Sequence, residues 1–477
     1  MKKLTKIVAT IGPSSDSPEK IEKLINLGVN IFRFNYKHAD TNWHRERLKL
    51  LKKVCKEKNL RTATLLDLQG PEVRLKMPFD SIELDEGEKI FLSQEVFKNK
   101  EKGFSLSVPE IIENLDEDQQ ISADDGLFEF TVKKEDGKTY LLSYSSGTLL
   151  NNKAVSIVDL DYDFPTIHEK DREGLHLAKA EGIDFIALSF VRNAKDLENL
   201  KNEMGKIGLN AKIVAKIETA KATQNIDEII DATDAVMVAR GDLGVEMPME
   251  QVPFWQKEII RKCLQKGVPV ITATQMLESM THNSIPTRAE VSDVSNAVYD
   301  FTDAVMLSGE TANGKYPEEA VDVMAKIIKF SEEKTHVPDI RTLFKYELND
   351  ISEMICDSAF NLYKALKSKE QKIKGFLVFT ESGKTARMLS RYRPHVAIYS
   401  FCPNEELVNK LAINYAVKPI FQKSLKSKNE IVKDDIREAL EILKNAGSCQ
   451  DGDRFIVLHG DYWTSESGTS TIRVISA

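Results

Sequence analysis

Residues 212–242 read KIVAKIETAKATQNIDEIIDATDAVMVARGD, and this stretch contains the repeating unit of the fold. It opens on an apolar run rich in Val and Ile, continues with apolar residues at helical spacing, and closes on a second apolar run. Parallel strands need a crossover connection, which is usually a helix. The stretch therefore predicts a strand, a helix and a second strand parallel to the first.

The same alternation recurs throughout the residues before 310. The apolar runs are Lys6 to Ile11, Asn30 to Asn35, Thr62 to Asp67, Phe185 to Phe190, Lys212 to Glu218, Ala235 to Arg240, Val268 to Thr274 and Ala304 to Gly309. Eight strand-and-helix units predict an α/β fold in which a parallel sheet closes into a (β/α)8 TIM barrel.

One connection, between Asp67 and Phe185, is far longer than the others. It alternates apolar and polar residues between turn sequences such as DEGE (85–88), EDGK (135–138) and SSGT (145–148), which indicates a small all-β domain. Because it leaves the barrel after the third strand, it should cover the C-terminal mouth, where barrel enzymes carry their catalytic groups. We call this insertion the lid.

A further α/β unit follows the barrel. Its apolar runs are Gly375 to Thr380, Val396 to Phe401, Lys418 to Phe421, Phe455 to Gly460 and Thr471 to Ser476. We therefore expect the barrel at 1–69 and 165–338, the lid at 70–164, and a C-terminal α/β regulatory domain at 339–477.

Composition limits the classes of partner. The 477 residues include 42% hydrophobic and 29% charged residues, which is typical of a folded globular protein of more than one domain. The net charge of −8 provides no basic field for nucleic acid. The five cysteines form no CxxC pair, no apolar run reaches membrane-spanning length, and the N-terminus shows no apolar signal core. We expect a cytoplasmic protein without nucleic-acid or membrane partners.

Charged residues gather at the predicted strand ends. Lys216 and Glu218 lie two apart, so their side chains should point the same way, into the barrel. Glu218 and Asp242 suit Mg²⁺ or Mn²⁺ held by carboxylates and substrate oxygens. With Arg33 across the mouth, two cations and a divalent ion predict a small, multiply anionic substrate such as a phosphorylated carboxylate.

A structural ion pair that fills the barrel is the alternative for Lys216 and Glu218. Buried ion pairs contribute little to stability, so a convergent set of them favours a functional site.

Longer motifs at these positions are similar to those of the pyruvate kinase family along nearly the whole chain. They are TKIVATIGPSS (5–15), QGPEVR (69–74), ADDGL (123–127), DFIALSFVR (184–192), AKIET (215–219), MVARGDLGVE (237–246), ATQMLESM (273–280), PTRAEVSDVSNAV (286–298) and MLSGETANGKYP (306–317). The resemblance implies glycolytic phosphoryl transfer from phosphoenolpyruvate to ADP, and a homotetramer.

The resemblance also implies roles for individual residues. Lys216, Arg33 and Thr274 would be catalytic, with Lys216 stabilising the transferring group. Substrate would be bound by Arg33, Lys216, Gly241, Asp242 and Thr274. Glu218 and Asp242 would hold the metal. The nucleotide would contact Asn35, His38, Arg74 and Lys153, of which Lys153 is the weakest match because Ala154 follows it where the family has Gly.

The family's potassium site departs from its usual pattern here. Asn35 and Asp67 match two of its ligands, but Lys37 stands at a serine position and Leu68 at a threonine position. We hypothesise that the Lys37 ammonium replaces K⁺ and pairs with Asp67 or Glu72, which makes K⁺ dispensable. A solvent-facing Lys37 is the alternative.

The segment TESGKTA (380–386) is similar to the family's effector loop for sugar phosphates. Thr380, Ser382, Gly383, Lys384 and Thr385 would contact the phosphate. It is no P-loop, because Val378 stands where the first glycine belongs. A plain strand-to-helix turn is the alternative. The loop around Trp463 is acidic, which disfavours a bisphosphate effector.

The segment DLDYDF (159–164) is not expected to bind calcium, because it lacks the glycine of a calcium loop.

Three rival functions stay open from the sequence. A metal-dependent aldolase or lyase would use the same carboxylates and Arg33 but needs no nucleotide lid. A Schiff-base aldolase would need a neutral Lys216, which the adjacent Glu218 disfavours. A catalytically silent metabolite sensor would not require the charged set at the mouth.

Overall fold

The barrel forms as predicted, from eight parallel strands. They are β1 (Lys6–Thr10), β2 (Ile31–Asn35), β3 (Ala63–Asp67), β13 (Phe185–Leu188), β14 (Lys212–Ile217), β15 (Ala235–Ala239), β16 (Val270–Ala273) and β17 (Ala304–Leu307). The sheet closes in the order β1-β17-β16-β15-β14-β13-β3-β2. This computed structural model describes residues 3–124, 126–158, 165–334, 340–343, 346–426, 433–460 and 468–477.

Burial on both faces explains why the strands are continuous apolar runs. Side chains such as Val8, Leu65 and Met237 fill the inside of the barrel, while others such as Phe32, Ile186 and Val238 pack against the surrounding helices. The helices of this domain are α1 (Pro18–Leu27), α2 (Thr41–Lys58), α5 (Glu169–Glu181), α6 (Ala194–Ile207), α7 (Ala220–Gln224), α8 (Ile226–Ala232), α9 (Arg240–Glu246), α10 (Val252–Lys266), α11 (Arg288–Tyr299), α12 (Gly309–Ala312) and α13 (Pro317–Lys334).

Six of the eight predicted strands extend too far at their C-terminal ends. Phe190 lies in a turn beyond β13, Glu218 follows the last residue of β14, and Arg240 begins α9. Asp242 therefore lies in the first turn of a helix rather than at a strand end. Thr274 likewise follows β16 in a left-handed conformation, with φ of 64°. Apolar composition marks a buried strand but does not show where its backbone turns away.

The lid is a second closed barrel, of seven strands ordered β10-β6-β7-β4-β12-β8-β9, beside the pair β11-β5. Its elements are β4 (Val73–Lys76), β5 (Ser81–Leu84), β6 (Lys89–Leu92), α3 (Glu95–Asn99), β7 (Gly103–Leu106), α4 (Ile111–Asn114), β8 (Gln120–Ala123), β9 (Phe128–Glu135), β10 (Lys138–Ser143), β11 (Gly147–Leu150) and β12 (Ala154–Ile157). The predicted EDGK turn joins β9 to β10 through Asp136 and Gly137, both with positive φ, as a tight hairpin turn requires.

The C-terminal domain is a five-stranded sheet ordered β20-β19-β18-β21-β22, with β22 antiparallel to its neighbour. Its elements are α14 (Ile340–Leu343), α15 (Ile351–Ser368), β18 (Ile373–Phe379), α16 (Lys384–Ser390), β19 (Ala397–Cys402), α17 (Glu405–Lys410), β20 (Val417–Phe421), α18 (Lys433–Asn445), β21 (Arg454–His459) and β22 (Thr471–Ser476). Residues of α15, α16 and α17 pack on one face and those of α18 on the other.

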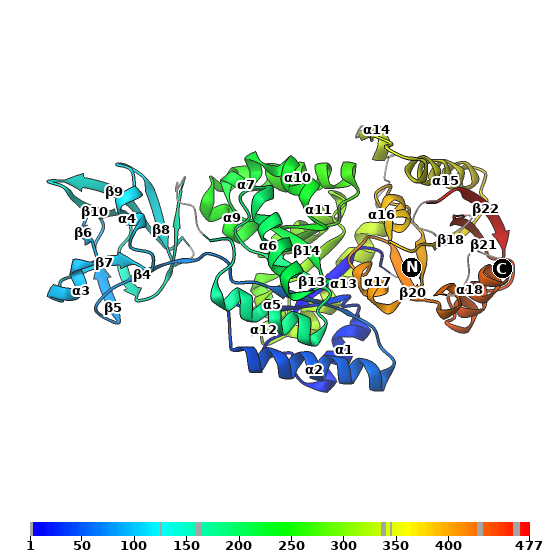
Figure 1. Ribbon diagram of the computed structural model, residues 1–477, viewed down its shortest axis with the longest axis horizontal. Coiled ribbons are helices and arrows are strands. Elements are labelled where there is room, and N and C mark those ends of the chain that lie inside the picture. Colours follow the sequence, from blue (N-terminus) through cyan, green and yellow to red (C-terminus); the bar gives the residue numbers. More distant parts are fainter. Residues whose placement is uncertain are drawn as a thin grey trace.

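The three units lie in a row along the longest axis, with the lid at one end, the TIM barrel in the middle and the C-terminal sheet at the other end (Figure 1). The lid joins the mouth of the TIM barrel. The opposite, N-terminal end of the barrel, which we call the bottom, meets the C-terminal domain, where the Leu4 carbonyl accepts from the Ala416 N–H. The predicted boundaries at 164/165 and 338/339 lie beside or within residues outside the described ranges, so these limits stay predictions.

Candidate functional site

Lys216 is the centre of a buried charged cluster at the mouth. Its Nζ lies 2.7 Å from Glu218 Oε1 and 3.1 Å from Asp67 Oδ1, and it donates to Ser189 Oγ at 2.7 Å. The side chains of Lys216 and Glu218 therefore lie together, as their spacing predicts, and they also form the ion pair that was the alternative. The strands β3, β13 and β14 are neighbours in the sheet, and this order brings the residues together.

Arg33 joins the same cluster from β2. Its Nε donates to Asp67 Oδ2 at 2.7 Å, its Nη2 lies 2.6 Å from the same oxygen, and its Nη1 donates to Thr10 Oγ1 at 3.1 Å. Asp67 thus accepts from a different cation on each carboxylate oxygen. Two cations therefore share one buried carboxylate, an arrangement suited to attracting further negative charge.

Electrostatics fix the charge states of this cluster. Burial alone would lower the pKa of Lys216, but Asp67, Glu218 and Asp242 outweigh burial and raise it above its ordinary value. Burial alone would raise the pKa of Asp67, yet Lys216 and Arg33 hold it below its ordinary value. Lys216 is therefore a charged ammonium and Asp67 a carboxylate near neutral pH.

Glu218 and Asp242 are close enough to affect each other. Burial raises the pKa of Glu218 above its ordinary value, and the charge of Asp242 adds to the rise while Lys216 opposes it. A divalent cation would relieve this repulsion, so the pair fits a metal held by two carboxylates. Across the described ranges, no three or more His, Cys, Asp or Glu side chains gather as a metal cluster by themselves. Further ligands would come from substrate and water.

Strained backbone accompanies these residues. Phe190 has φ of 55°, and its N–H donates to Glu218 Oε2 at 2.7 Å. Thr274 also has a positive φ, and its Oγ1 accepts from the Gly241 N–H and donates to the Ala273 carbonyl, both at 2.7 Å. Left-handed non-glycine residues are unfavourable and concentrate at functional sites.

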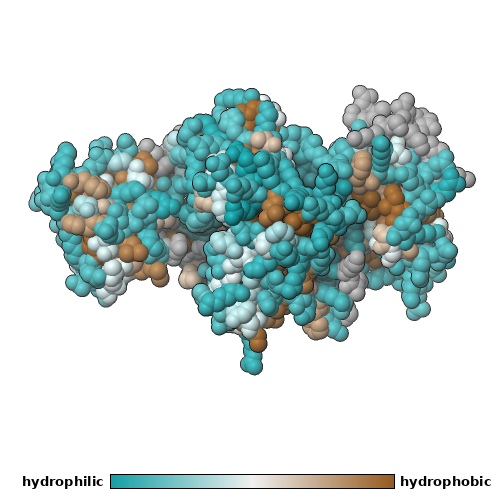
Figure 2. All heavy atoms as spheres, turned by 90° about the horizontal axis from the view of Figure 1, so that it is seen from below, coloured by the Kyte–Doolittle hydropathy of each residue, from teal (hydrophilic) through white to brown (hydrophobic). Residues whose placement is uncertain are grey.

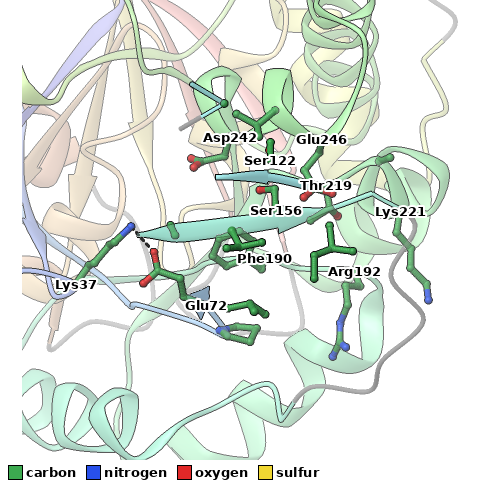
Figure 3. A pocket seen from close by; sticks show the side chains of 18 of the residues that line it. Lys37, Glu72, Ser122, Ser156, Phe190, Arg192, Thr219, Lys221, Asp242 and Glu246 are labelled. Atoms are coloured by element: carbon green, nitrogen blue, oxygen red, sulfur yellow. Dashed lines mark ion pairs between the residues drawn. The ribbon is translucent and has the colours of Figure 1, made fainter. Parts of the chain in front are cut away.

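A cleft of about 400 Å³ lies between the lid and the mouth. Ser122 and residues 154–157 line it from the lid, while Phe190, Thr219 and Asp242 line it from the barrel. Figure 3 shows Lys37 and Glu72 meeting in this cleft. The cleft has the size of a small-molecule site. Its position agrees with the prediction that the insertion covers the mouth.

Lys37 and its neighbours form a second charged group beside the cluster. Lys37 Nζ lies 2.6 Å from Glu72 Oε1, and Arg74 Nη2 lies 2.6 Å from Glu72 Oε2. Of the two predicted partners for Lys37, the structure selects Glu72, because Asp67 already pairs with Arg33 and Lys216. Asn35 accepts from the Lys37 N–H at 3.3 Å.

The predicted nucleotide residues are spread over both domains. His38 is exposed just beyond β2, and Arg74 also donates to the Asn152 carbonyl at 2.7 Å. Lys153, on the lid, lies 2.7 Å from Asp124 Oδ1. These three residues do not form one cluster, and none of them is among the residues that line the cleft.

The predicted effector loop lies between β18 and α16 in the C-terminal domain. Its groups contact protein atoms: Lys384 pairs with Asp350, Thr380 Oγ1 accepts from the Gly383 N–H at 2.9 Å, and Thr385 Oγ1 lies 2.5 Å from Thr469 Oγ1. Ser382 is exposed. Trp463 and the segment 159–164 lie outside the described residues.

Sequence reasoning missed Ser189, Phe190 and the contacts of Arg240. Ser189 could have been found, because it lies at the end of a predicted strand like the residues that were selected. Phe190 acts through its backbone N–H, and Arg240 through contacts some 33 residues away in sequence. Nothing in their residue types reveals these roles.

Comparison with known proteins agrees with the family resemblance of the sequence motifs, and it extends along nearly the whole chain. A family model described as "Pyruvate kinase, barrel domain" matches residues 2–321, and one described as "Pyruvate kinase, alpha/beta domain" matches residues 353–475. A pyruvate kinase of Sporosarcina psychrophila is 42% identical over 443 residues, covering 92% of this chain and 75% of the relative. A pyruvate kinase of Staphylococcus aureus strain MRSA252 is 40% identical over 482 residues, covering 99% and 80%.

Proposed function

The chain belongs to the pyruvate kinase family of phosphotransferases, and from that premise we propose that it moves the phosphoryl group of phosphoenolpyruvate to ADP at the barrel mouth. The observation that carries the proposal is the buried cluster of Lys216, Arg33, Asp67 and Glu218 beside the lid-covered cleft, which Asp242 lines from the barrel. Its cations match an anionic phosphoryl donor, and its carboxylates match a divalent metal.

Lys216 and Arg33 would bind the phosphoryl group. Both are fixed by buried partners, so they need no reorganisation as negative charge develops during transfer. The raised pKa of Lys216 keeps it an ammonium, which suits charge stabilisation and opposes the Schiff-base chemistry of the rival aldolase.

Glu218 and Asp242 would hold Mg²⁺ or Mn²⁺ together with substrate oxygens. When bound, the metal would neutralise charge on the transferring group and the enolate. The Phe190 N–H fixes the second oxygen of Glu218, leaving the carboxylate in one orientation.

Gly241 and Thr274 would bind the substrate carboxylate. In the structure these two groups satisfy each other, with the Gly241 N–H donating to Thr274 Oγ1. A carboxylate arriving there would accept from both the Gly241 N–H and the Thr274 hydroxyl, which now donates to Ala273. Asn35, His38, Arg74 and Lys153 would contact the nucleotide from the rim and the lid.

Lys37 would take the place of the family's monovalent cation. Its ammonium, 2.6 Å from Glu72 Oε1, provides a positive charge beside the mouth, as a potassium ion would otherwise do. Leu68 is buried and offers no side-chain oxygen. We expect full activity in buffer free of Na⁺ and K⁺.

A reversal variant sharpens this cation test. In Lys37→Ser/Leu68→Thr, two oxygen ligands return and the ammonium is lost, so activity should fall without K⁺ and recover when K⁺ is added. Lys170→Ser is the control, because Lys170 donates to the Lys37 carbonyl without pairing with Glu72. Strong K⁺ activation of the unmodified protein would reject the replacement.

The proposed assembly is a homotetramer. Exposed apolar side chains on two separate faces support it: Phe254, Val291 and Tyr299 on α10 and α11, and Ile351, Met354 and Val474 on α15 and the edge strand β22. Figure 2 shows that apolar patches interrupt an otherwise hydrophilic surface.

Among the described residues, no helix is both long and apolar enough to cross a membrane. Sugar-phosphate regulation stays a prediction, and such an effector would have to displace Asp350 from Lys384.

A coupled assay tests the activity. Purified protein with phosphoenolpyruvate, ADP and Mg²⁺ should form pyruvate and ATP in equal amounts, and chelation of the metal should stop both. Pyruvate and inorganic phosphate formed in equal amounts without ADP would indicate transfer to water instead of ADP, and no pyruvate under any condition would favour the aldolase, the lyase or the silent sensor.

A further inference from the structure

Two consecutive non-glycine residues after β16, Thr274 and Gln275, are left-handed, with φ of 64° and 54°. Side chains make this conformation unfavourable, and such strain persists only where surrounding contacts enforce it. Thr274 is the residue whose hydroxyl meets the Gly241 N–H. Whatever holds this turn therefore sets the position of that hydroxyl.

Arg240 holds the turn. Its Nη2 donates to the Thr274 carbonyl at 2.7 Å, and its Nε donates to the Ala273 carbonyl at 3.3 Å. The fork of the guanidinium is itself fixed by Asp293 of α11, whose two oxygens accept from Nη1 and Nη2 at 2.7 Å each. A planar guanidinium held in this way fixes the positions of the Ala273 and Thr274 carbonyls relative to each other.

Arg240 does not line the cleft beneath the lid. It lines a neighbouring hollow of about 930 Å³ beside α9, together with Gln275 and Asp293. An effect of Arg240 on substrate would therefore pass through the backbone, that of the Thr274 turn and that of Gly241, the next residue in the chain.

We propose that Arg240, locked by Asp293, is a positioning residue that holds the left-handed turn so that Thr274 and Gly241 present their donors to the carboxylate of the phosphorylated substrate. This inference rests on the function proposed above for Thr274. It predicts a defect confined to that substrate, because no contact of Arg240 reaches the nucleotide residues.

Arg240→Lys tests the proposal. Lysine keeps the charge but cannot bridge Asp293 and two carbonyls at once. We expect kcat/KM for phosphoenolpyruvate to fall roughly 10- to 100-fold, as for a misplaced binding group, with the KM for ADP unchanged. Equal changes in both KM values, or only a lower melting temperature, would overturn the proposal.

Arg393→Lys is a matched control. At the bottom of the barrel, Arg393 pairs with Asp303 and donates through Nη2 to the carbonyl of Phe301, which is also left-handed with φ of 70°. The same substitution there should lower stability and leave both KM values unchanged. A selective loss for phosphoenolpyruvate in this control would also contradict the proposal.

A second substitution tests the strain directly. In the Arg240→Lys background, Gln275→Gly should recover several-fold in kcat/KM for phosphoenolpyruvate, because glycine adopts positive φ without penalty. Gln275→Ala removes the same side-chain contacts and keeps the penalty, so it should not recover. Equal recovery of kcat/KM by the Gln275→Gly and Gln275→Ala variants would overturn the proposal. Absence of activity in the unmodified protein would instead overturn the proposed function.

Discussion

The two ends of the TIM barrel bury similar charged groups and use them differently. At the bottom, Arg393 and Asp303 are 2% and 4% exposed and pair at 2.7 Å, while Asp303 also accepts from the Tyr415 N–H at 2.9 Å. This pair fastens the C-terminal domain to the barrel. At the mouth, Arg33 and Lys216 share Asp67 beside an open cleft.

The comparison shows that a buried ion pair by itself does not indicate function. Buried charges contribute little to stability unless their remaining hydrogen bonds are satisfied. At the bottom, the partners belong to two domains of the chain and satisfy each other. At the mouth, the cluster lies beside a cleft that a ligand can enter, so under the proposed function its cations would stabilise charge that arrives with a substrate.

Loss of a proposed metal ligand should have a large effect among the changes that separate the two ends. Glu218→Gln removes one carboxylate charge and keeps the shape, so we expect kcat to fall roughly 10²- to 10³-fold. The Mg²⁺ concentration for half-maximal rate should rise more than the roughly 10- to 100-fold typical of supporting residues. Steady-state kinetics against Mg²⁺ concentration measures both.

Glu332→Gln is the corresponding change at the bottom. Glu332 is buried and accepts from the Leu4 N–H at 2.9 Å and the Thr5 N–H at 2.6 Å. It should alter stability and leave the Mg²⁺ dependence as it is. A shared change in Mg²⁺ dependence would break the distinction between the two ends.

Breaking the bottom pair should mainly affect stability. Arg393→Met leaves Asp303 buried without its cation, which costs about 3–5 kcal/mol and should lower the melting temperature by roughly 10 °C. Turnover measured well below that temperature should be retained. If Arg393→Met kept a normal melting temperature and lost turnover, the bottom of the barrel would contain catalytic groups, and the account would be contradicted.

The smallest expected effect is a pH dependence that arises at the bottom. Burial, together with the nearby charge of Lys418, lowers the pKa of Lys6 from its ordinary value of 10.5 to about 7, although Glu332 and Asp303 oppose the shift. Between these values unfolding takes up a proton at Lys6, so stability rises with pH, by up to about 1.4 kcal/mol per unit.

Lys6→Met should flatten that rise. Melting temperatures of the two proteins should be measured at pH 7, 8 and 9. The melting temperature of the unmodified protein should rise relative to that of the variant as pH increases, because titrations common to both cancel in the difference. A constant difference across the three values would remove Lys6 from the account of stability.

The fold was largely predictable because barrel strands are buried on both faces and read as apolar runs, and because Asp136 and Gly137 mark a tight hairpin. Much of the charged set was also predictable, since parallel strands bring their ends together. The left-handed turns at Phe190 and Thr274 were not, because tertiary contacts impose them. The choice of Glu72 over Asp67 by Lys37 was likewise decided by Arg33 and Lys216, whose pairing with Asp67 no local pattern reveals.

Lys216→Met compared with Arg393→Met tests the central claim most directly, because it removes one buried cation from each end of the barrel. Rates of pyruvate formation from phosphoenolpyruvate and ADP, measured on folded protein with Mg²⁺, should fall roughly 10³-fold for the mouth variant and stay near the original rate for the bottom variant. Undiminished pyruvate formation by Lys216→Met would contradict the account.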